Sequence, residues 1–258
     1  MNTTEMQVIR DKVRSILRDH ATAKLCGKGK YCAFRAYNPR SGKYGAKIYS
    51  GLTKQLQRRI YPKQTPPIGR SHSKFNGRTR GRRVDAQLSK VVNRKCFRIR
   101  NGERLYGMTK IALASLHEQG LEPIKAQVPV CCDASGIATA VDILAARKCH
   151  DDNDMLELVV VELKTGYDQD RMKQNQQLQL KAPLNMVNDN WCARHLAQLA
   201  CTWRMFIQNK EMVLALKNRC KVRDVTAMLL YVTDHDQEMV ELPYFYGERS
   251  RQVLQQLK

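Results

Sequence analysis

The pattern of apolar and polar positions predicts helices and only short strands in the first half of the chain. Five apolar residues recur at helical spacing over residues 5–20 and would form one face: Met6, Ile9, Val13, Ile16 and Leu17. Two more helices are predicted over residues 82–92 and 110–119. Between the first two helices, glycine, proline and cations dominate, so only two strand-like pieces are expected, over residues 31–37 and 46–49.

After residue 129, longer apolar segments alternate with polar ones. Residues 137–146 predict a strand, and residues 156–163 form a near-continuous apolar run, typical of a strand buried on both faces. A polar turn over residues 148–154 separates them. A helix over residues 191–209 is expected next, with Asn188 or Asp189 as its N-cap. Two strands and a terminal helix follow, over residues 226–232, 239–243 and 252–257. This order predicts a mixed α/β fold, with a central β-sheet flanked by helices.

Composition excludes a membrane protein and points to an intracellular one. The 258 residues are 43% hydrophobic, which is enough for a sizeable core, but the longest apolar runs are too short to span a bilayer. The N-terminus carries charges where a secretory leader would be apolar. Nine scattered cysteines are typical of reduced thiols inside a cell. A zinc site from His20, Cys26 and Cys32 is disfavoured because the spacing lacks closely paired ligands.

Positive charge is concentrated in the first 100 residues. They hold 26 Lys and Arg against 4 Asp and Glu, whereas residues 101–258 hold 19 against 20. Such an excess of positive charge in one part of the chain attracts polyanions and favours nucleic acid as the partner. Residues 70–83 are the densest stretch, although a solvated linker or a nuclear-import sequence has the same composition.

We therefore predict a basic nucleic-acid-binding extension over residues 1–79, followed by a core over residues 80–258. Aromatic residues among the cations would suit base stacking: Tyr31, Phe34, Tyr37, Tyr44 and Tyr49. The predicted phosphate contacts come from the dense stretch and its flank: Arg70, Lys74, Arg78, Arg80, Arg82 and Arg83.

Two carboxylates and a lysine lie within or at the end of apolar strands, where unpaired charge is costly: Asp142, Glu162 and Lys164. If the two strands form a hairpin, its turn is centred near residue 152, which places Asp142 directly opposite Glu162 or within one or two residues of it. Facing carboxylates repel each other unless a cation lies between them. Mg²⁺ or Mn²⁺ is the expected cation, because hard divalent ions prefer oxygen ligands.

Lys164 and Gln198 extend this arrangement. Side chains two positions apart on a strand share a face, so Lys164 is expected beside Glu162. There its ammonium would hold a water and help to deprotonate it, or would stabilise charge on a phosphate in the transition state. Gln198 belongs to a polar stripe on the predicted helix, with His195 and Thr202 as bystanders. It would orient a water or a phosphate, although an exposed glutamine without a role is the simpler interpretation.

These segments resemble the PD-(D/E)xK nuclease superfamily, especially the branch of lambda-type exonucleases and the nuclease domains of bacterial recombination enzymes. The resemblance covers roughly residues 80–243 and rests on VDIL at 141–144, VVVELKTG at 159–166 and the Gln198-Leu199 pair. It implies a restriction-endonuclease-like core and catalytic roles for Asp142, Glu162, Lys164 and Gln198. The implied metal ligands are Asp142, Glu162 and the main-chain carbonyl of Leu163.

The same resemblance adds Asp85 as a metal ligand. Members carry a Gly-x-x-x-(His/Glu) element on an upstream helix, and the segment from Gly81 to Asp85 matches it with Asp in the ligand position. A surface ion pair of Asp85 with Arg82 or Lys90 is the simpler alternative. The sequence departs from the family name by having Val141 where the proline would be, a replacement that is common in the family.

The sequence thus predicts a Mg²⁺- or Mn²⁺-dependent deoxyribonuclease, a hydrolase expected to act as an exonuclease in replication, recombination or repair. A non-catalytic nucleic-acid-binding accessory protein and a junction-resolvase-type endonuclease stay open as alternatives. The expected partner is DNA, as double-stranded ends or single strands; RNA, a homo-oligomer and a recombination partner protein also stay open. The basic run suggests the nucleus of a host cell or viral replication.

Overall fold

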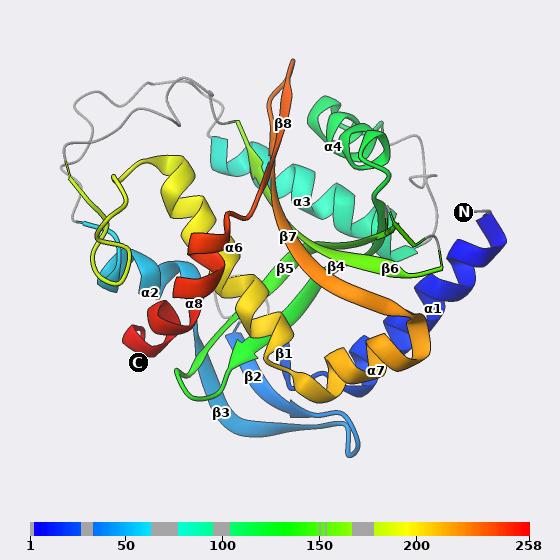
Figure 1. Cartoon of the computed structure of the whole chain (residues 1–258), viewed down its shortest axis with the longest axis horizontal. Helices are drawn as coiled ribbons and strands as arrows, with labels where there is room; N and C mark the ends of the chain where they lie inside the picture. The colour runs from blue at the N-terminus through cyan, green and yellow to red at the C-terminus, as the bar shows by residue number, and fades with distance from the viewer. Residues whose placement is uncertain are drawn as a thin grey trace.

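The computed structural model describes residues 3–26, 33–62, 77–94, 104–149, 151–152, 154–166 and 178–258. Eight strands form one mixed sheet, shown in Figure 1. They are β1 (Ala23–Cys26), β2 (Ala33–Asn38), β3 (Lys43–Gly51), β4 (Glu122–Cys132), β5 (Ile137–Lys148), β6 (Leu156–Thr165), β7 (Val222–Val232) and β8 (Gln237–Glu241). The strand order is β1-β2-β3-β5-β6-β7-β8, and β4 pairs with β5.

Helices cover both faces of this sheet. They are α1 (Thr3–Asp19), α2 (Leu52–Arg59), α3 (Gly77–Arg94), α4 (Gly107–Glu118), α6 (Trp191–Ile207), α7 (Lys210–Cys220) and α8 (Tyr244–Gln256). The main core packs α1, α2, α6, α7 and α8 against strand residues such as Val160. A second core packs α3 and α4 against residues such as Val159 and Val161. Since alternate residues of β6 enter the two cores, the prediction of a strand buried on both faces is confirmed.

One edge of β5 is shared by two strands. Residues 137 and 138 of β5 pair with β3 in parallel, whereas residues 143–148 pair with β6 in antiparallel orientation. Along its other edge, β5 pairs with β4 over residues 137–146. Asp142 therefore lies in the interval between the β3 and β6 ladders, where the sheet divides.

The mixed α/β class, with a central sheet flanked by helices, is confirmed. The predicted helices and strands are present, with α3 starting before residue 82 and α8 starting before residue 252. The N-cap of α6 is Asn190, whose side chain accepts a hydrogen bond from the N–H of Ala193, so the prediction of Asn188 or Asp189 was wrong. Two helices, α2 and α7, and two strands, β1 and β4, were not predicted.

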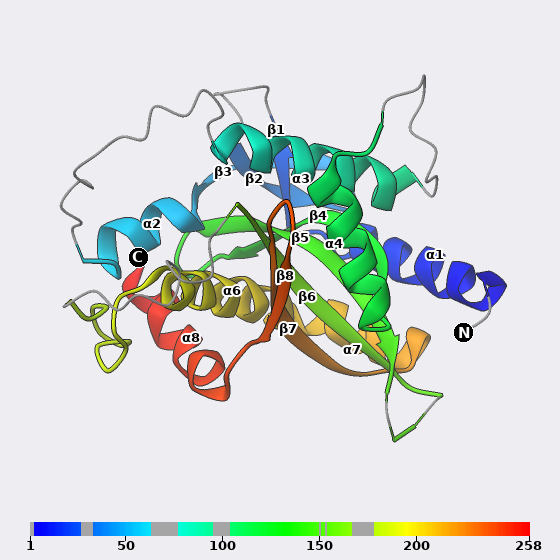
Figure 2. The same cartoon turned by 90° about the horizontal axis from the view of Figure 1, so that it is seen from above.

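The division of the chain at residue 79 stays a prediction, but the described residues on either side of it share one sheet and one main core. Val13 and Ile16 of α1 and Leu56 of α2 are buried together with residues of α6. Figure 2 shows α2, α6 and α8 at the end of the molecule that holds the C-terminus, with α1 and the N-terminus at the other end. Within the described ranges, no helix has the length and apolar character needed to cross a membrane.

Candidate active site

Asp142 and Glu162 are brought together by the β5–β6 hairpin. The antiparallel ladder runs from Lys148↔Leu156 to Ile143↔Val161, and continuing this register by one pair sets Asp142 against Glu162. The predicted register is thus confirmed. Beyond the ladder, the main-chain N–H of Leu163 donates to Oδ2 of Asp142 at 3.0 Å. The carboxylate of Asp142 is therefore anchored directly on β6.

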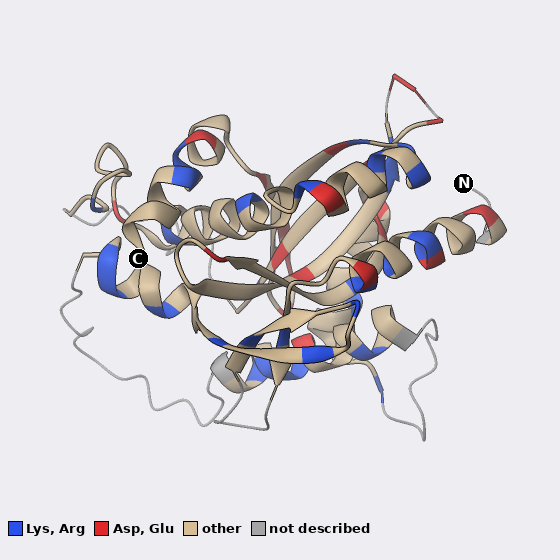
Figure 3. Cartoon of the chain, turned by 90° about the horizontal axis from the view of Figure 1, so that it is seen from below, with Lys and Arg blue, Asp and Glu red and all other residues tan. Residues whose placement is uncertain are grey.

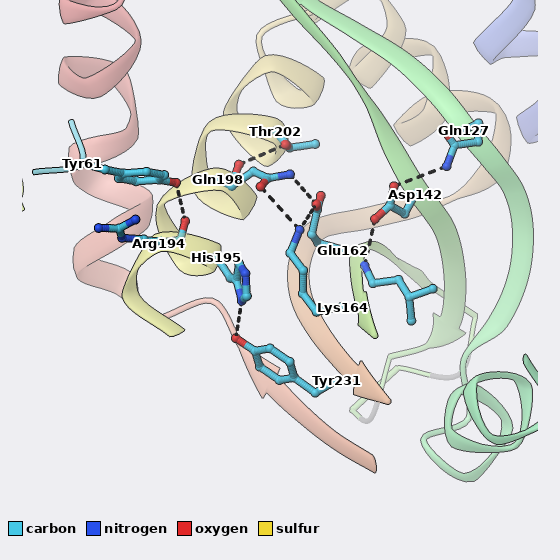
Figure 4. A network of polar contacts seen from close by, with 11 residues as sticks. Tyr61, Gln127, Asp142, Glu162, Lys164, Arg194, His195, Gln198, Thr202 and Tyr231 are labelled. Atoms are coloured by element: carbon cyan, nitrogen blue, oxygen red, sulfur yellow. Dashed lines mark hydrogen bonds and ion pairs between the residues drawn. The ribbon is translucent and has the colours of Figure 1, made fainter. Parts of the chain in front are cut away.

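Glu162, Lys164 and Gln198 form a bonded cluster, drawn in Figure 4. Oε1 of Glu162 accepts from Nζ of Lys164 at 2.6 Å and from Nε2 of Gln198 at 2.5 Å. Nζ of Lys164 also lies 3.4 Å from Oε1 of Gln198. Glu162 is 3% exposed. Lys164 faces Glu162, as the strand periodicity predicts, and α6 reaches the strand through Gln198.

Two carboxyl groups of the site, those of Asp142 and Asp85, have pKa values raised above the usual range. Burial, followed by the charge of Glu162, raises the pKa of Asp142 well above its usual range, with Lys164 acting in the opposite direction. Burial raises the pKa of Asp85 to about 6, and the charges that act on it come from Lys164 and Glu162. Arg82 and Lys90, the partners considered for a surface ion pair, are not among those charges. The four ionisable residues thus interact as one group.

Gly81 explains how Asp85 on α3 comes near the end of β6. A Cβ added at Gly81 would lie 2.9 Å from Oγ1 of Thr165, which is closer than side-chain atoms pack. Glycine therefore lets α3 approach the strand end that carries Lys164. Asp85 lies one helical turn further along α3. The Gly-x-x-x-Asp spacing consequently has a packing reason in this fold.

Replacing Gly81 with Val should lower both stability and any activity of this site. The added side chain pushes α3 away from Thr165, and overpacking of this kind costs about 1–3 kcal/mol. Urea unfolding and a cleavage assay measure the two losses, and the double variant Gly81→Val, Thr165→Ala should recover part of each. Wild-type behaviour of the single variant would show that this contact does not position Asp85.

Several polar residues of the site were not predicted. Gln127 of β4 donates to Oδ1 of Asp142 at 3.3 Å. Arg194 forms a two-bonded ion pair with Asp189, with Nε–Oδ1 and Nη2–Oδ2 both 2.5 Å, and its carbonyl accepts from the hydroxyl of Tyr61 at 2.7 Å. This buried pair holds the segment before α6 and the end of α2 against the helix that carries Gln198. Gln127 and Asp142 are 15 residues apart, and Tyr61 and Arg194 are 133 residues apart, so spacing gives no signal for these two contacts.

His195 and Thr202 were expected to be bystanders. Nδ1 of His195 lies 3.1 Å from the hydroxyl of Tyr231 on β7. Burial, with Lys164 and Arg194 nearby, lowers the pKa of His195 to about 2, so the imidazole is neutral at ordinary pH. Thr202 donates to the carbonyl of Gln198 at 3.0 Å. Both residues support α6 from within.

The predicted phosphate-binding residues fall into two groups. Arg70, Lys74 and the side chain of Arg78 lie outside the described residues. Arg80 pairs with Asp234 at 3.2 Å, Arg82 is exposed on α3, and the Arg83 guanidinium lies 5.2 Å from the ring centroid of Tyr106. Figure 3 shows the Lys and Arg residues along the chain. Phosphate binding by these residues stays a prediction.

The aromatic residues proposed for base stacking also differ in availability. Tyr49 is buried, with its hydroxyl donating to Asp133 at 2.5 Å, so it is not free to stack on a base. Tyr37 and Tyr44 form an edge-to-face pair with centroids 5.5 Å apart, and Nζ of Lys24 lies 3.6 Å from the Tyr37 centroid. Tyr44 is exposed. Tyr31 lies outside the described residues.

The candidate metal ligands are carboxylate oxygens near the point where the sheet divides. Among the residues that the structure describes, no three His, Cys, Asp or Glu side chains are gathered closely enough to form a ready-made metal site, which includes the surroundings of His20 and Cys26. The chemistry of the set nevertheless fits a hard divalent cation. Burial, followed by the charge of Glu162, raises the pKa of Asp142, and burial raises the pKa of Asp85, with Glu162 acting in the same direction.

Comparison with known proteins assigns no family to this chain. No protein-family model matches the chain, and a search of curated proteins finds no relative. Among solved structures, the chain is similar to the crystal structure of a "putative exonuclease" from Eubacterium rectale, with a TM-score of 0.36 and 10% identity. The match covers 72% of this chain and 66% of that one. At this level of similarity, the activity of that protein is not transferred to this chain.

Proposed function

We propose that this chain is a metal-dependent DNA nuclease of the PD-(D/E)xK type. One observation carries the proposal. The buried carboxylate of Glu162 accepts hydrogen bonds from Lys164 and Gln198 and lies next to Asp142 at the point where the sheet divides. A structural ion pair accounts for Glu162 and Lys164, but it does not account for two further acids whose pKa values are raised.

Asp142, Glu162 and Asp85, together with the carbonyl of Leu163, would hold Mg²⁺ or Mn²⁺. The bound ion would polarise the scissile phosphodiester and make a water more acidic. Two side chains of the protein supply the other functions of the site. The ammonium of Lys164 donates to a phosphate oxygen and stabilises the charge that develops there. Gln198 fixes Glu162 and Lys164 relative to each other, because it bonds to both.

The decisive experiment is metal-dependent cleavage of labelled DNA. We expect the purified chain to degrade linear duplex or single-stranded DNA with Mg²⁺ or Mn²⁺, and to be inactive in EDTA. Glu162→Gln should lower the rate by at least about 100-fold while DNA binding remains, because removing one electrostatic group of a site costs this much. Glu157→Gln is the matched control, since Glu157 is also on β6 and also paired, with Nε of Arg147 at 2.8 Å.

Substrate ends separate the two modes of attack. An exonuclease degrades linear DNA and spares closed circles and end-blocked strands, whereas an endonuclease cleaves all three. We propose the exonuclease mode, with a role in recombination, replication or repair, on the resemblance of the site segments alone. Retained DNA binding without cleavage under any divalent metal would instead identify a binding protein.

A further inference from the structure

A pocket of about 480 Å³ lies along β4, between α1, β1 and α6, and is called the β4 pocket below. Within the described residues β4 pairs with β5 alone, and residues 125 and 127–131 of β4 line this pocket. Apolar side chains form the floor: Leu17, Val128, Val130, Met205, Phe206 and Met212. A volume of this size and a largely apolar lining are typical of sites that hold a small organic group.

The rim of the β4 pocket is cationic. Its charged lining residues are Arg14, Arg18, Lys24 and Lys125, together with His20, and no Asp or Glu is among the lining residues. Arg14 donates to two neutral carbonyls, of Ile124 at 2.8 Å and Val92 at 2.5 Å, so its charge is not cancelled. Arg18 lies 3.6 Å from exposed Asp19, a weakly paired contact. The rim therefore keeps an excess of positive charge.

Burial and repulsion by neighbouring cations, Arg10 among them, disfavour the charged forms of Lys125 and Arg14. The pKa of Lys125 is lowered by burial and then by Arg14 and Arg18, and the pKa of Arg14 is lowered by burial and by Arg10. No hydrogen bond or ion pair joins the side chain of Lys125 to another described residue. Like charges crowded over an apolar floor are costly unless an anion binds between them. The pocket is thus complementary to a ligand with an apolar body and a negative group.

Gln127 connects the β4 pocket to the candidate active site. It lines the pocket, and its side chain donates to Oδ1 of Asp142 at 3.3 Å. Its neighbours pair as Ala126↔Ile143 and Val128↔Val141, so Gln127 lies across from Asp142 in the ladder. Its φ of 55° is in the left-handed region, which is uncommon for a residue other than glycine. A ligand in the pocket therefore lies one side chain away from Asp142.

We propose that the β4 pocket holds one nucleotide of a DNA strand that passes Asp142, with the base on the apolar floor and a phosphate against Lys125 and Arg18. This inference rests on the proposed nuclease function and extends it, because it names where the strand beside the scissile bond is held. A nucleotide fits both halves of the pocket at once: every base has an apolar face that stacks on side chains, and every phosphate carries the matching charge.

The test is binding of a fluorescent 12-nucleotide oligothymidylate to the full chain in EDTA, so that cleavage plays no part. Lys125→Ala should weaken binding about 5- to 10-fold and reduce the slope of log affinity against log salt by about one phosphate contact. Ala21→Phe, which fills the pocket from its lining without changing charge, should weaken binding about 10-fold with an unchanged salt slope. Lys110→Ala, an exposed cation on α4 in the opposite layer, is the matched control and should have little effect.

Abasic substitutions test the base itself. With the wild-type chain, removing the base at one position of the oligonucleotide should cost about as much affinity as Ala21→Phe, and with Ala21→Phe it should cost nothing more. Thermal unfolding confirms that both variants are folded. The proposal is overturned if Ala21→Phe binds the oligonucleotide like the wild type. It is also overturned if inorganic phosphate raises the thermal stability of the chain while removal of the base has no effect on affinity, because the pocket would then bind an anion and not a nucleotide.

Failure of this inference is distinguishable from failure of the nuclease proposal. If the chain cleaves DNA but Lys125→Ala and Ala21→Phe bind the oligonucleotide like the wild type, the nucleotide pocket is wrong and the nuclease proposal stands. If binding responds to both variants but the chain does not cleave DNA with any divalent metal, the pocket is supported and the nuclease proposal is wrong.

Discussion

Replacing Lys164 with Met is expected to lower the rate of DNA hydrolysis by about 10²–10³ and to destabilise the metal-free protein. The ammonium lies 2.6 Å from Oε1 of Glu162, and Glu162 is buried. Met therefore leaves a buried carboxylate without its bonded cation, and removing one partner of a buried ion pair costs about 3–5 kcal/mol. The loss of rate follows from removing a charged donor placed where the phosphate gains charge.

Urea unfolding in EDTA and in Mg²⁺ separates the two roles of Lys164. A divalent ion beside Glu162 supplies part of the missing positive charge, so Mg²⁺ should stabilise Lys164→Met more than it stabilises the wild type. Lys148→Met, at the far end of the same hairpin, should change neither cleavage nor the response to Mg²⁺. Wild-type cleavage by Lys164→Met would exclude Lys164 from the chemistry, and equal Mg²⁺ effects would argue against a metal at Glu162.

The β5–β6 hairpin is predictable from sequence because its signals are local. An apolar run, a polar turn and a second apolar run fix the register, and the observed pair Ile143↔Val161 keeps the constant sum that the turn centre requires. Glu162 and Lys164 then share a face by strand periodicity alone. The central part of the candidate site thus follows from about thirty consecutive residues.

β4 shows where such local signals fail. It contains Pro123 and Pro129, which argue against a strand in sequence. Among the described residues β4 pairs with β5 alone and is therefore an edge strand, a position in which proline is tolerated. The left-handed φ of Gln127 interrupts the alternation further. A strand of this kind is recognisable when its partner β5 is in place, and not before.

The rest of the site depends on contacts between remote segments. Asp85 reaches the cluster because Gly81 lets α3 approach Thr165, about eighty residues away in the chain. The family resemblance gives the Gly-x-x-x-Asp spacing, but the packing reason appears in three dimensions alone. Gln127 lies across a ladder from Asp142, and Arg194 pairs with Asp189 under Tyr61. Apart from the Asp189–Arg194 pair, whose residues are five positions apart, these contacts join segments too distant in sequence for a local pattern to indicate them.

Asp142→Asn should abolish cleavage and yet raise the stability of the metal-free protein above neutral pH. Burial and the charge of Glu162 raise the pKa of Asp142, so the folded state disfavours its ionised form. An acid with a raised folded-state pKa stabilises the fold at low pH, and this contribution is lost as the pH rises from the unfolded value, about 3.9, through the folded value. Asn keeps an oxygen for the N–H of Leu163 and carries no charge at any pH.

Thermal unfolding in EDTA from pH 4 to pH 8 measures this difference. The wild type should lose stability as the pH rises, with Asp85 contributing up to its pKa of about 6, whereas Asp142→Asn should lose less. At pH 8 the variant should have the higher Tm, by about 2–4 °C for each kcal/mol of repulsion removed, and at pH 4 the two should converge. Because a divalent ion relieves the same repulsion, Mg²⁺ should stabilise the wild type and so reduce the difference in Tm between Asp142→Asn and the wild type at pH 8. If Asp142→Asn is instead less stable than the wild type at pH 8 without metal, favourable contacts stabilise the Asp142 carboxylate. In that case, repulsion between Asp142 and Glu162 does not favour binding of a cation.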